Sequence, residues 1–236
     1  MPTADFNIDS LAAYLHVAPA QVMKLVERGK LPSRRVGGEW RFSTAEIHHW
    51  LEERIGLSTD EELQQLEGAL ARIRRGNALE LISIAEMLPF SAIAVPLAAR
   101  TRSSVIGEMV EVAARTGWLW DTEKLAEAVR SREELMPTAL DSGVAVLHPR
   151  RPLPNILDRA FLAFGRCERG LPFGNPRGVL TDLFFVVCST DDRTHLRTLA
   201  RLSRLLSDAD FLAEVREAPD AAAVRAAMVG FEERLP

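Results

Sequence analysis

The stretch "GVAVLHPR" (residues 143–150) decides how the second half of the chain folds. Small and branched apolar residues precede His148 and Pro149 follows it, which predicts a buried strand that ends where the imidazole enters a loop. A histidine in such a place is either packed in the core or able to react with a ligand. The answer depends on what the rest of the chain places beside it.

Predicted helices and strands alternate on both sides of this stretch. Strands that are apolar on both faces are typical of a sheet covered by helices on each side. We therefore predict an α/β domain over residues 77–236, with a mixed β-sheet flanked by helices on both faces. The predicted helices cover residues 103–116, 122–131, 193–206 and 221–228, and two further strands lie in "RAFLAFGR" (159–166) and "DLFFVVCS" (182–189).

Length and composition indicate a two-domain protein of the cytoplasm. The chain has 236 residues, more than one typical domain of about 100–200 residues, and its net charge of −4 argues against a whole surface that coats nucleic acid or membrane. The sequence shows no signal peptide and no apolar run near the roughly 20 residues that span a bilayer, so no membrane insertion is expected. Cys167 and Cys188 lack metal-ligand spacing, so we expect reduced structural thiols, with no metal and no cofactor.

Residues 1–56 show the pattern of a helix-turn-helix. Two short helical patterns in "NIDSLAAYLHVAPAQVMKLVERGKLP" (7–32) are separated by a tight connection. Asn7 suits the cap of the first helix, and Pro19 suits the first position of the second. The outer face of the second helix is the one expected to meet DNA.

A small hairpin and a third helix follow. Gly37 and Gly38 in "SRRVGGEWRF" (33–42) can adopt the positive φ angles of a two-residue turn, which predicts a β-wing. Trp40 is expected in the core of this domain rather than as a residue that stacks on a base. Ser43 and Glu46 predict a capping box for the closing helix.

Residues 57–76 predict one connector helix. The segment is charged, lacks proline and spaces its apolar residues at three and four positions. Its apolar stripe can pack within the chain or against its own copy in a dimer, and the sequence leaves both open.

Residues 6–55 resemble the excisionase family of winged helix-turn-helix domains, which is related to the DNA-binding head of MerR-type regulators. The matching text is "NIDSLAAYL", "VAPAQVMKLVERGKLP" and "RRVGGEWRFSTAEIHHWL". The resemblance implies DNA binding, with a dimer pairing two half-sites, although a protein-interaction or dimerisation head is the alternative. The local charge of residues 20–42 is +4. The residues expected to contact DNA are Gln21, Lys24, Arg28, Arg34, Arg35 and Arg41.

Residues 77–233 resemble the type-2 IIA domain of the phosphoenolpyruvate-dependent phosphotransferase system, the fructose/mannitol class that includes the nitrogen-regulatory IIA proteins. That family has an arginine in an "RE" dipeptide, a histidine that ends a "GIAIPH" strand and a second histidine in a "THL" helix start. Arg132, His148 and His195 occur here in the same order. The resemblance implies that His148 accepts phosphate while Arg132 and His195 bind its oxygens.

Each of these residues also has a structural alternative. Arg132 could instead form a surface ion pair with Glu133 or Glu134, and His195 could be an ordinary polar residue at a helix start.

The loop before the histidine departs from the family pattern "STGIGNGIAIPHG". In "PTALDSGVAVLHPR" (137–150), Ala139 and Asp141 replace glycines, Leu147 replaces the proline, and Pro149 follows the histidine. Because like charges repel, we expect the Asp141 carboxylate to oppose an incoming phosphoryl group.

The fusion of the two domains favours a regulatory protein. In this interpretation a histidine phosphocarrier such as HPr, or its nitrogen-branch relative, phosphorylates His148 and thereby alters DNA binding, in a transcriptional response to carbon or nitrogen status. Two alternatives stay open. One is a module without phosphoryl chemistry that senses a ligand or a partner kinase, and the other is a phosphocarrier component of sugar transport.

Overall fold

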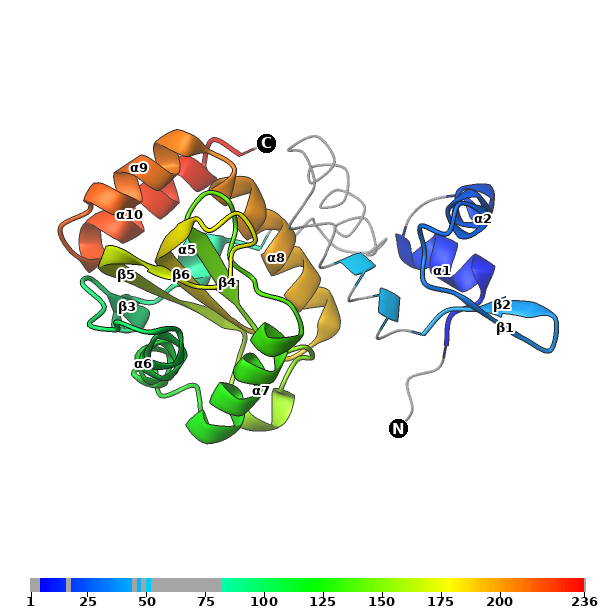
Figure 1. The fold of residues 1–236 in the computed structure, drawn as a ribbon, viewed down its shortest axis with the longest axis horizontal. Coiled ribbons are helices and arrows are strands. Elements are labelled where there is room, and N and C mark those ends of the chain that lie inside the picture. The colour runs from blue at the N-terminus through cyan, green and yellow to red at the C-terminus, as the bar shows by residue number, and fades with distance from the viewer. Residues whose placement is uncertain (1–4, 16–17, 44–45, 48–49, 52–81, 236) are drawn as a thin grey trace. The chain divides into compact units, whose positions relative to one another are not determined.

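The computed structural model describes residues 5–15, 18–43, 46–47, 50–51 and 82–235 (Figure 1). The chain divides into two compact units, residues 1–81 and 82–236. The predicted connector helix over 57–76 lies outside the described residues.

The first unit contains the two predicted helices, α1 (Ile8–Leu15) and α2 (Pro19–Glu27). Asn7 caps α1, because its Oδ1 accepts a hydrogen bond of 2.8 Å from the backbone N–H of Ser10. Pro19 opens α2, where its missing N–H costs nothing. The predicted helix-turn-helix elements are therefore confirmed.

The predicted wing is a hairpin of β1 (Arg34–Val36) and β2 (Glu39–Arg41). Gly37 and Gly38 have φ angles of +61° and +85°, as a two-residue hairpin turn of this type requires. Trp40 is only half-buried, so its assignment to the core is wrong: the guanidinium of Arg35 lies 4.7 Å from its ring centroid and shares its surface position.

The closing helix is described only at residues 46–47 and 50–51, which are helical. Ile47 and Leu51 are buried, and the indole N–H of Trp50 donates to the carbonyl of Lys30 at 2.6 Å.

The second unit is built on the predicted mixed sheet, with strands in the order β3-β5-β6-β4. The β4 strand is parallel to β6, β5 is antiparallel to β6, and β3 is parallel to β5. The strand bounds are Ile93–Ala94 (β3), Val144–Leu147 (β4), Phe161–Pro172 (β5) and Leu180–Cys188 (β6).

Helices cover both faces of this sheet, as predicted (Figure 1). The α6 and α7 helices lie on one face, and their buried side chains share a core with Ala145, Leu147 and Phe184. The α5, α8, α9 and α10 helices lie on the other face. Their bounds are Ile84–Met87 (α5), Arg102–Ala114 (α6), Thr122–Leu135 (α7), Asp192–Leu206 (α8), Ala209–Glu217 (α9) and Ala221–Glu232 (α10), with single 3₁₀ turns at Phe90–Ala92 (η1) and Pro154–Ile156 (η2).

Neither cysteine is poised for chemistry. Cys167 and Cys188 are buried free thiols, and burial raises the pKa of Cys167 to about 11 and the pKa of Cys188 further still. Among the described residues, no group of three or more His, Cys, Asp or Glu side chains could hold a metal ion. No described helix has both the length and the hydropathy needed to cross a bilayer.

A buried carboxylate joins three helices of the second unit. Glu232, in the last turn of α10, forms an ion pair of 2.7 Å with Nε of Arg201 on α8. Its two oxygens also accept hydrogen bonds from the backbone N–H groups of Ile84 and Ala85 and from the hydroxyl of Ser83 at the start of α5. Burial alone would raise the pKa of Glu232, but the hydrogen bonds, first from Ala85 and then from Arg201, bring it below its ordinary value.

Glu232→Gln should therefore lower the free energy of unfolding at pH 7 by about 3 kcal/mol, because the buried guanidinium of Arg201 would lose the carboxylate with which it pairs. In the wild type, the stabilisation that comes from ionised Glu232 is complete above its pKa in the unfolded chain, about 4.3. It is lost as the pH falls through the lower pKa that Glu232 has in the folded protein. Urea unfolding between pH 7 and 3 should show a shallower loss of stability in the variant. The neighbouring exposed residue provides the control, Glu233→Gln, and equal profiles for both variants would contradict the assignment.

Candidate functional site

The parallel pairing of β4 with β6 brings the site residues to one edge of the sheet. Leu147 pairs with Val186, so the carboxyl ends of the two strands lie together. His148 is the first residue after β4, and Ser189 is the first after β6. The chain then enters α8 at once, which brings His195 back over the same edge.

The two histidines face one another. The ring centroids of His148 and His195 are 5.3 Å apart, with 55° between the ring planes. The structure therefore brings together two imidazoles that are distant in the sequence. His195 Nδ1 lies 3.2 Å from the hydroxyl of Ser189, a contact that the sequence reasoning missed.

A backbone carbonyl fixes the tautomer of His148. Its Nδ1 lies 2.8 Å from the carbonyl oxygen of Val146. Because a carbonyl only accepts, Nδ1 must carry the proton, and the lone pair of the neutral ring is then on Nε2. The ring therefore directs its nucleophilic nitrogen away from its own strand.

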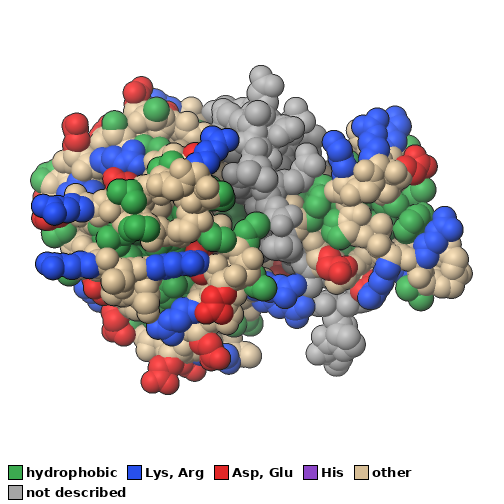
Figure 2. Space-filling view, in the orientation of Figure 1, with side chains coloured by type: hydrophobic (Ala, Val, Ile, Leu, Met, Phe, Trp, Pro, Cys, Tyr) green, Lys and Arg blue, Asp and Glu red, His purple; other side chains and the backbone are tan. Residues whose placement is uncertain are grey.

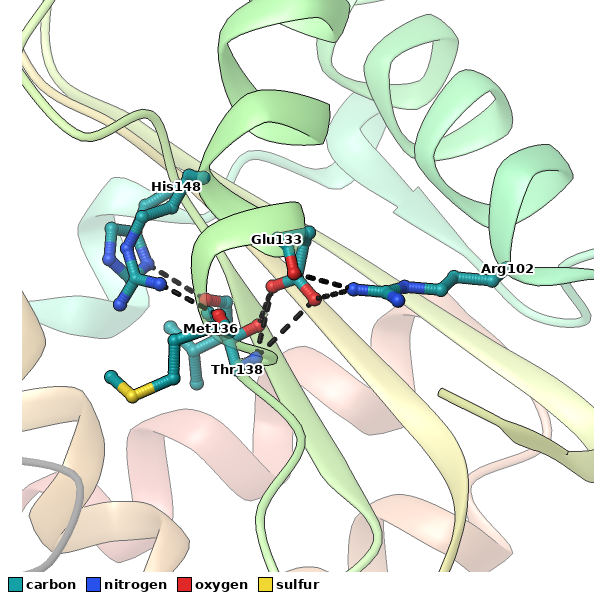
Figure 3. A network of polar contacts seen from close by, with 7 residues as sticks. Arg102, Glu133, Met136, Thr138 and His148 are labelled. Atoms are coloured by element: carbon teal, nitrogen blue, oxygen red, sulfur yellow. Dashed lines mark hydrogen bonds and ion pairs between the residues drawn. The ribbon is translucent and has the colours of Figure 1, made fainter. Parts of the chain in front are cut away.

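Arg132 reaches the same edge from the last turn of α7. Beyond this helix one isolated antiparallel bridge joins Ala139 to Ala145 of β4. Figure 3 shows Met136 and His148 on one side of the end of α7. Nη1 of Arg132 donates to the carbonyl of Met136 at 2.8 Å.

The structure contradicts the alternative role of Arg132 as a partner in a surface ion pair. The residue is 4% exposed, makes no ion pair with any other described residue, and has a buried Nε without a hydrogen-bond partner in the described part of the chain. Its guanidinium thus keeps donor capacity at the site.

Glu133, next to Arg132 in the last turn of α7, forms hydrogen bonds with Thr138 and Arg102, as Figure 3 shows. Its buried carboxylate accepts hydrogen bonds from the hydroxyl and the backbone N–H of Thr138, the latter at 3.1 Å. Nη2 of Arg102 lies 3.2 Å from the same carboxylate and 2.7 Å from the carbonyl of Glu133. These contacts fix the chain on both sides of Met136, whose carbonyl orients Arg132.

The histidine rings are buried in this structure. His148 is 5% exposed and His195 is 2% exposed, and both Nε2 atoms are covered. The predicted strand end at His148 is confirmed, but the ring does not emerge into solvent. Transfer of a group to Nε2 would therefore require the surrounding side chains to move.

The predicted repulsion by Asp141 is wrong, because this residue lies at the other end of β4. Asp141 precedes the strand and His148 follows it, and a rise of about 3.3 Å per residue separates the two by roughly 16 Å. The Asp141 carboxylate instead pairs with Arg177 at 2.9 Å and accepts from Asn175 at 3.0 Å.

The start of α8 already has a capping carboxylate. Asp191 accepts hydrogen bonds from the backbone N–H of Thr194 at 2.8 Å and from its hydroxyl at 2.7 Å. The backbone N–H of Thr194 is therefore occupied and is not available to bind an anion.

In the first unit, the structure distinguishes among the residues expected to contact DNA. Gln21 caps α2, since its Oε1 accepts from the N–H of Ala18 at 3.2 Å, whereas Lys24 and Arg28 are exposed. Figure 2 shows Lys and Arg side chains on the visible face of this unit. On the wing, Arg34 pairs with Asp5, Arg35 lies over Trp40, and Arg41 pairs with Glu39 at 2.9 Å.

Two family matches account for both units. Residues 86–229 match the family described as "Phosphoenolpyruvate-dependent sugar phosphotransferase system, EIIA 2". The chain belongs to this EIIA family. Residues 6–55 match a helix-turn-helix domain family, so the chain carries a helix-turn-helix domain ahead of its EIIA domain.

Curated relatives resemble the EIIA domain. The chain is 34% identical over 118 residues to a nitrogen regulatory protein of Bradyrhizobium diazoefficiens, a match that covers 48% of this chain and 75% of the relative. It is 30% identical over 139 residues to the fructose-specific EIIABC component of the phosphotransferase system of Bacillus subtilis, covering 58% of this chain. This second match spans only 21% of that much longer relative.

Solved structures share the fold of the second unit. The nitrogen regulatory protein IIA-Ntr from Neisseria meningitidis superposes with a TM-score of 0.56 and 25% identity, over 61% of this chain and 98% of that protein. The mannitol IIA protein from Escherichia coli gives a TM-score of 0.52 at 18% identity, over 58% and 96% of the two chains, and this likeness shows the fold alone.

The tautomer of His148 can be measured directly. We expect ¹⁵N NMR of the unphosphorylated protein to show a protonated Nδ1 and an unprotonated Nε2 for the neutral ring of His148, because Val146 offers only an acceptor. The Ser189 hydroxyl can donate or accept, so His195 is the internal comparison whose tautomer is not fixed in this way. A ring of His148 protonated on Nε2 alone would contradict the assignment.

Proposed function

We propose that His148 accepts a phosphoryl group on Nε2 from the phosphohistidine of a small phosphocarrier protein, and that this modification alters DNA binding by the helix-turn-helix domain. One observation carries the proposal. Two imidazoles and a buried arginine converge at the edge where β4 and β6 end, and a carbonyl holds the first imidazole in the nucleophilic tautomer.

The chemistry suits these groups. The lone pair of His148 Nε2 attacks the phosphorus as the donor's N–P bond breaks, so one N–P bond replaces another and the donor imidazole leaves with its electron pair. Such a transfer depends mainly on in-line positioning and on compensation of the charge on the phosphoryl oxygens. Arg132 can donate charge-assisted hydrogen bonds to these oxygens, and His195 can donate from its Nε2 when Ser189 donates to its Nδ1.

The regulatory part of the proposal has separate support. The chain carries a helix-turn-helix domain with a wing, and its second helix exposes Lys24 and is followed by the exposed Arg28; a domain that only relays phosphate does not need these features. A phosphoryl group adds close to two negative charges at a site that holds Arg132, enough to change the packing around it. We propose that a dimer of the chain binds DNA and that the response serves carbon or nitrogen status in the cytoplasm, in line with the nitrogen regulatory protein among its relatives.

The burial of both Nε2 atoms favours a second candidate. In that case the EIIA domain receives no phosphate and acts as a binding module, which senses a ligand or a partner kinase through its surface. The two candidates differ in one measurable step, the formation of a phosphohistidine.

Incubation with enzyme I, HPr and radiolabelled phosphoenolpyruvate should place an acid-labile phosphate on the wild-type protein and none on His148→Ala. His195→Ala and Arg132→Ala should each slow labelling by about 100-fold, because each removes a donor to the phosphoryl oxygens. Arg169→Ala, an exposed change on the far part of β5, should label normally. A wild-type protein that stays unlabelled with saturating HPr and with its nitrogen-branch relative would select the binding module.

DNA binding should show a measurable salt dependence. The double variant Lys24→Ala with Arg28→Ala is tested on a duplex of about 30 base pairs of mixed sequence. The magnitude of the slope of log K against log salt should fall by about 1.8, because each phosphate that is no longer neutralised contributes about 0.9. Fluorescence anisotropy over a salt series gives the slope. Arg100→Ala with Arg169→Ala is the control, because it removes the same charge from two exposed positions of the EIIA domain, and its slope should equal that of the wild type. An unchanged slope in the variant of Lys24 and Arg28 would contradict DNA binding through this face.

A further inference from the structure

Two arginines follow the site histidine directly on the surface. Arg150 and Arg151 are both exposed. Neither side chain makes a hydrogen bond, ion pair or ring contact with another described residue. The fold gives these two charges no structural role that would explain them.

The covalent chain ties both arginines to the rim of the site. Consecutive Cα atoms are 3.8 Å apart, so the Cα of Arg150 lies within about 8 Å of that of His148, and the Cα of Arg151 within about 11 Å. The backbone N–H of Leu153 donates to the carbonyl of Ser189 at 3.1 Å, which binds this segment to the loop that leads to His195. The rim on the side of His148 is therefore basic.

Other charged groups near the rim do not cancel this charge. Asp191 uses its carboxylate to cap α8, and Asp192 is followed directly by Arg193. Glu134 is exposed on α7, and the buried Arg132 beside it adds positive charge beneath the surface. Arg150 and Arg151 themselves have no acidic partner among the described residues, so no ion pair neutralises their charges.

We propose that Arg150 and Arg151 form a docking edge for a donor protein whose surface around its phosphohistidine is acidic. This inference rests on the proposed phosphorylation of His148. In-line transfer brings the donor histidine to within a few ångströms of His148 Nε2, so the donor surface must pass over both arginines. A basic donor face would meet like charges there, whereas carboxylates would attract and orient the donor.

The effect should fall on association rather than on the chemical step. Arg132 and His195 serve the phosphoryl oxygens, while the exposed pair contacts the donor protein beside its histidine. Substitutions of Arg150 and Arg151 should therefore change KM for the protein donor and leave kcat unchanged.

A charge exchange tests the proposal. The donors are two variants of phosphorylated HPr, one with two surface residues beside its histidine changed to Glu and the other with the same two changed to Lys. The acceptors are the wild type, Arg150→Glu with Arg151→Glu, and a control with Arg100→Glu and Arg169→Glu. These two control arginines are also exposed but lie just before α6 and on the later part of β5, and they alter the net charge equally.

With the wild type and the control, the Glu-bearing donor should have a KM at least tenfold below that of the Lys-bearing donor. With the double variant the preference should reverse. The same preference in all three acceptors would overturn the docking edge. Phosphoramidate, a small donor without a protein surface, gives a second test. If the double variant lost labelling from phosphoramidate as much as from the protein donor, the docking edge would also be overturned, because the arginines would then act on the phosphoryl group itself.

Two further outcomes are distinguishable. If the double variant loses affinity for a mixed-sequence DNA duplex while its donor preference is unchanged, the arginines bind nucleic acid and the docking edge is overturned. If the wild type takes phosphate from neither protein donor nor phosphoramidate, the proposed function itself fails, a result that no charge exchange can produce.

Discussion

The parallel pairing of β4 with β6 is the constraint on which the histidine site depends. It sets the carboxyl ends of two strands side by side, so that the residue after each strand contributes to one site. A shift of β4 by one residue would move every side chain of the strand to the opposite face of the sheet. Val146 and His148 would move with the strand, and His148 would leave its place beside the end of β6. The apolar side chains of β4, all buried, resist such a shift, so the packing of the core also fixes the position of His148.

Backbone carbonyls orient the charged and polar groups of the site. The carbonyl of Val146 fixes the ring of His148, and that of Met136 holds Arg132. A buried guanidinium is costly unless its donors are used, and one donor of Arg132 has no described partner. The structure therefore keeps a buried positive charge only partly satisfied, which suits an anion that arrives from outside. Glu133 supplies the rigidity, because its contacts with Thr138 and Arg102 hold the segment that presents the Met136 carbonyl.

The sequence predicts the elements better than their contacts. Periodicity, a capping asparagine and a pair of glycines located the helices and the wing, and three spaced residues located the candidate site. The two-residue strand β3 and the helix α9 were missed, because the first is too short to show a period and the second follows α8 almost without a break. Asp141 was misjudged although the predicted strand puts it at the opposite end from His148. The sequence did not reveal its partners, Asn175 and Arg177, which are distant along the chain.

Because the Nε2 atoms are covered, the proposed regulation depends on the free energy needed to open the site. If only a fraction of molecules has an open site, the observed rate of transfer is the rate of the open form multiplied by that fraction, and each 1.4 kcal/mol of opening free energy lowers it about tenfold. Phosphorylation would then stabilise the open arrangement, because Arg132 gains an anionic partner. Coupling between two sites is reciprocal. If phosphorylation changes the affinity for DNA by a given factor, bound DNA must change the equilibrium constant for phosphorylation by the same factor. A buried nucleophile is thus compatible with a switch, provided that one bistable rearrangement both uncovers His148 and alters the helix-turn-helix domain.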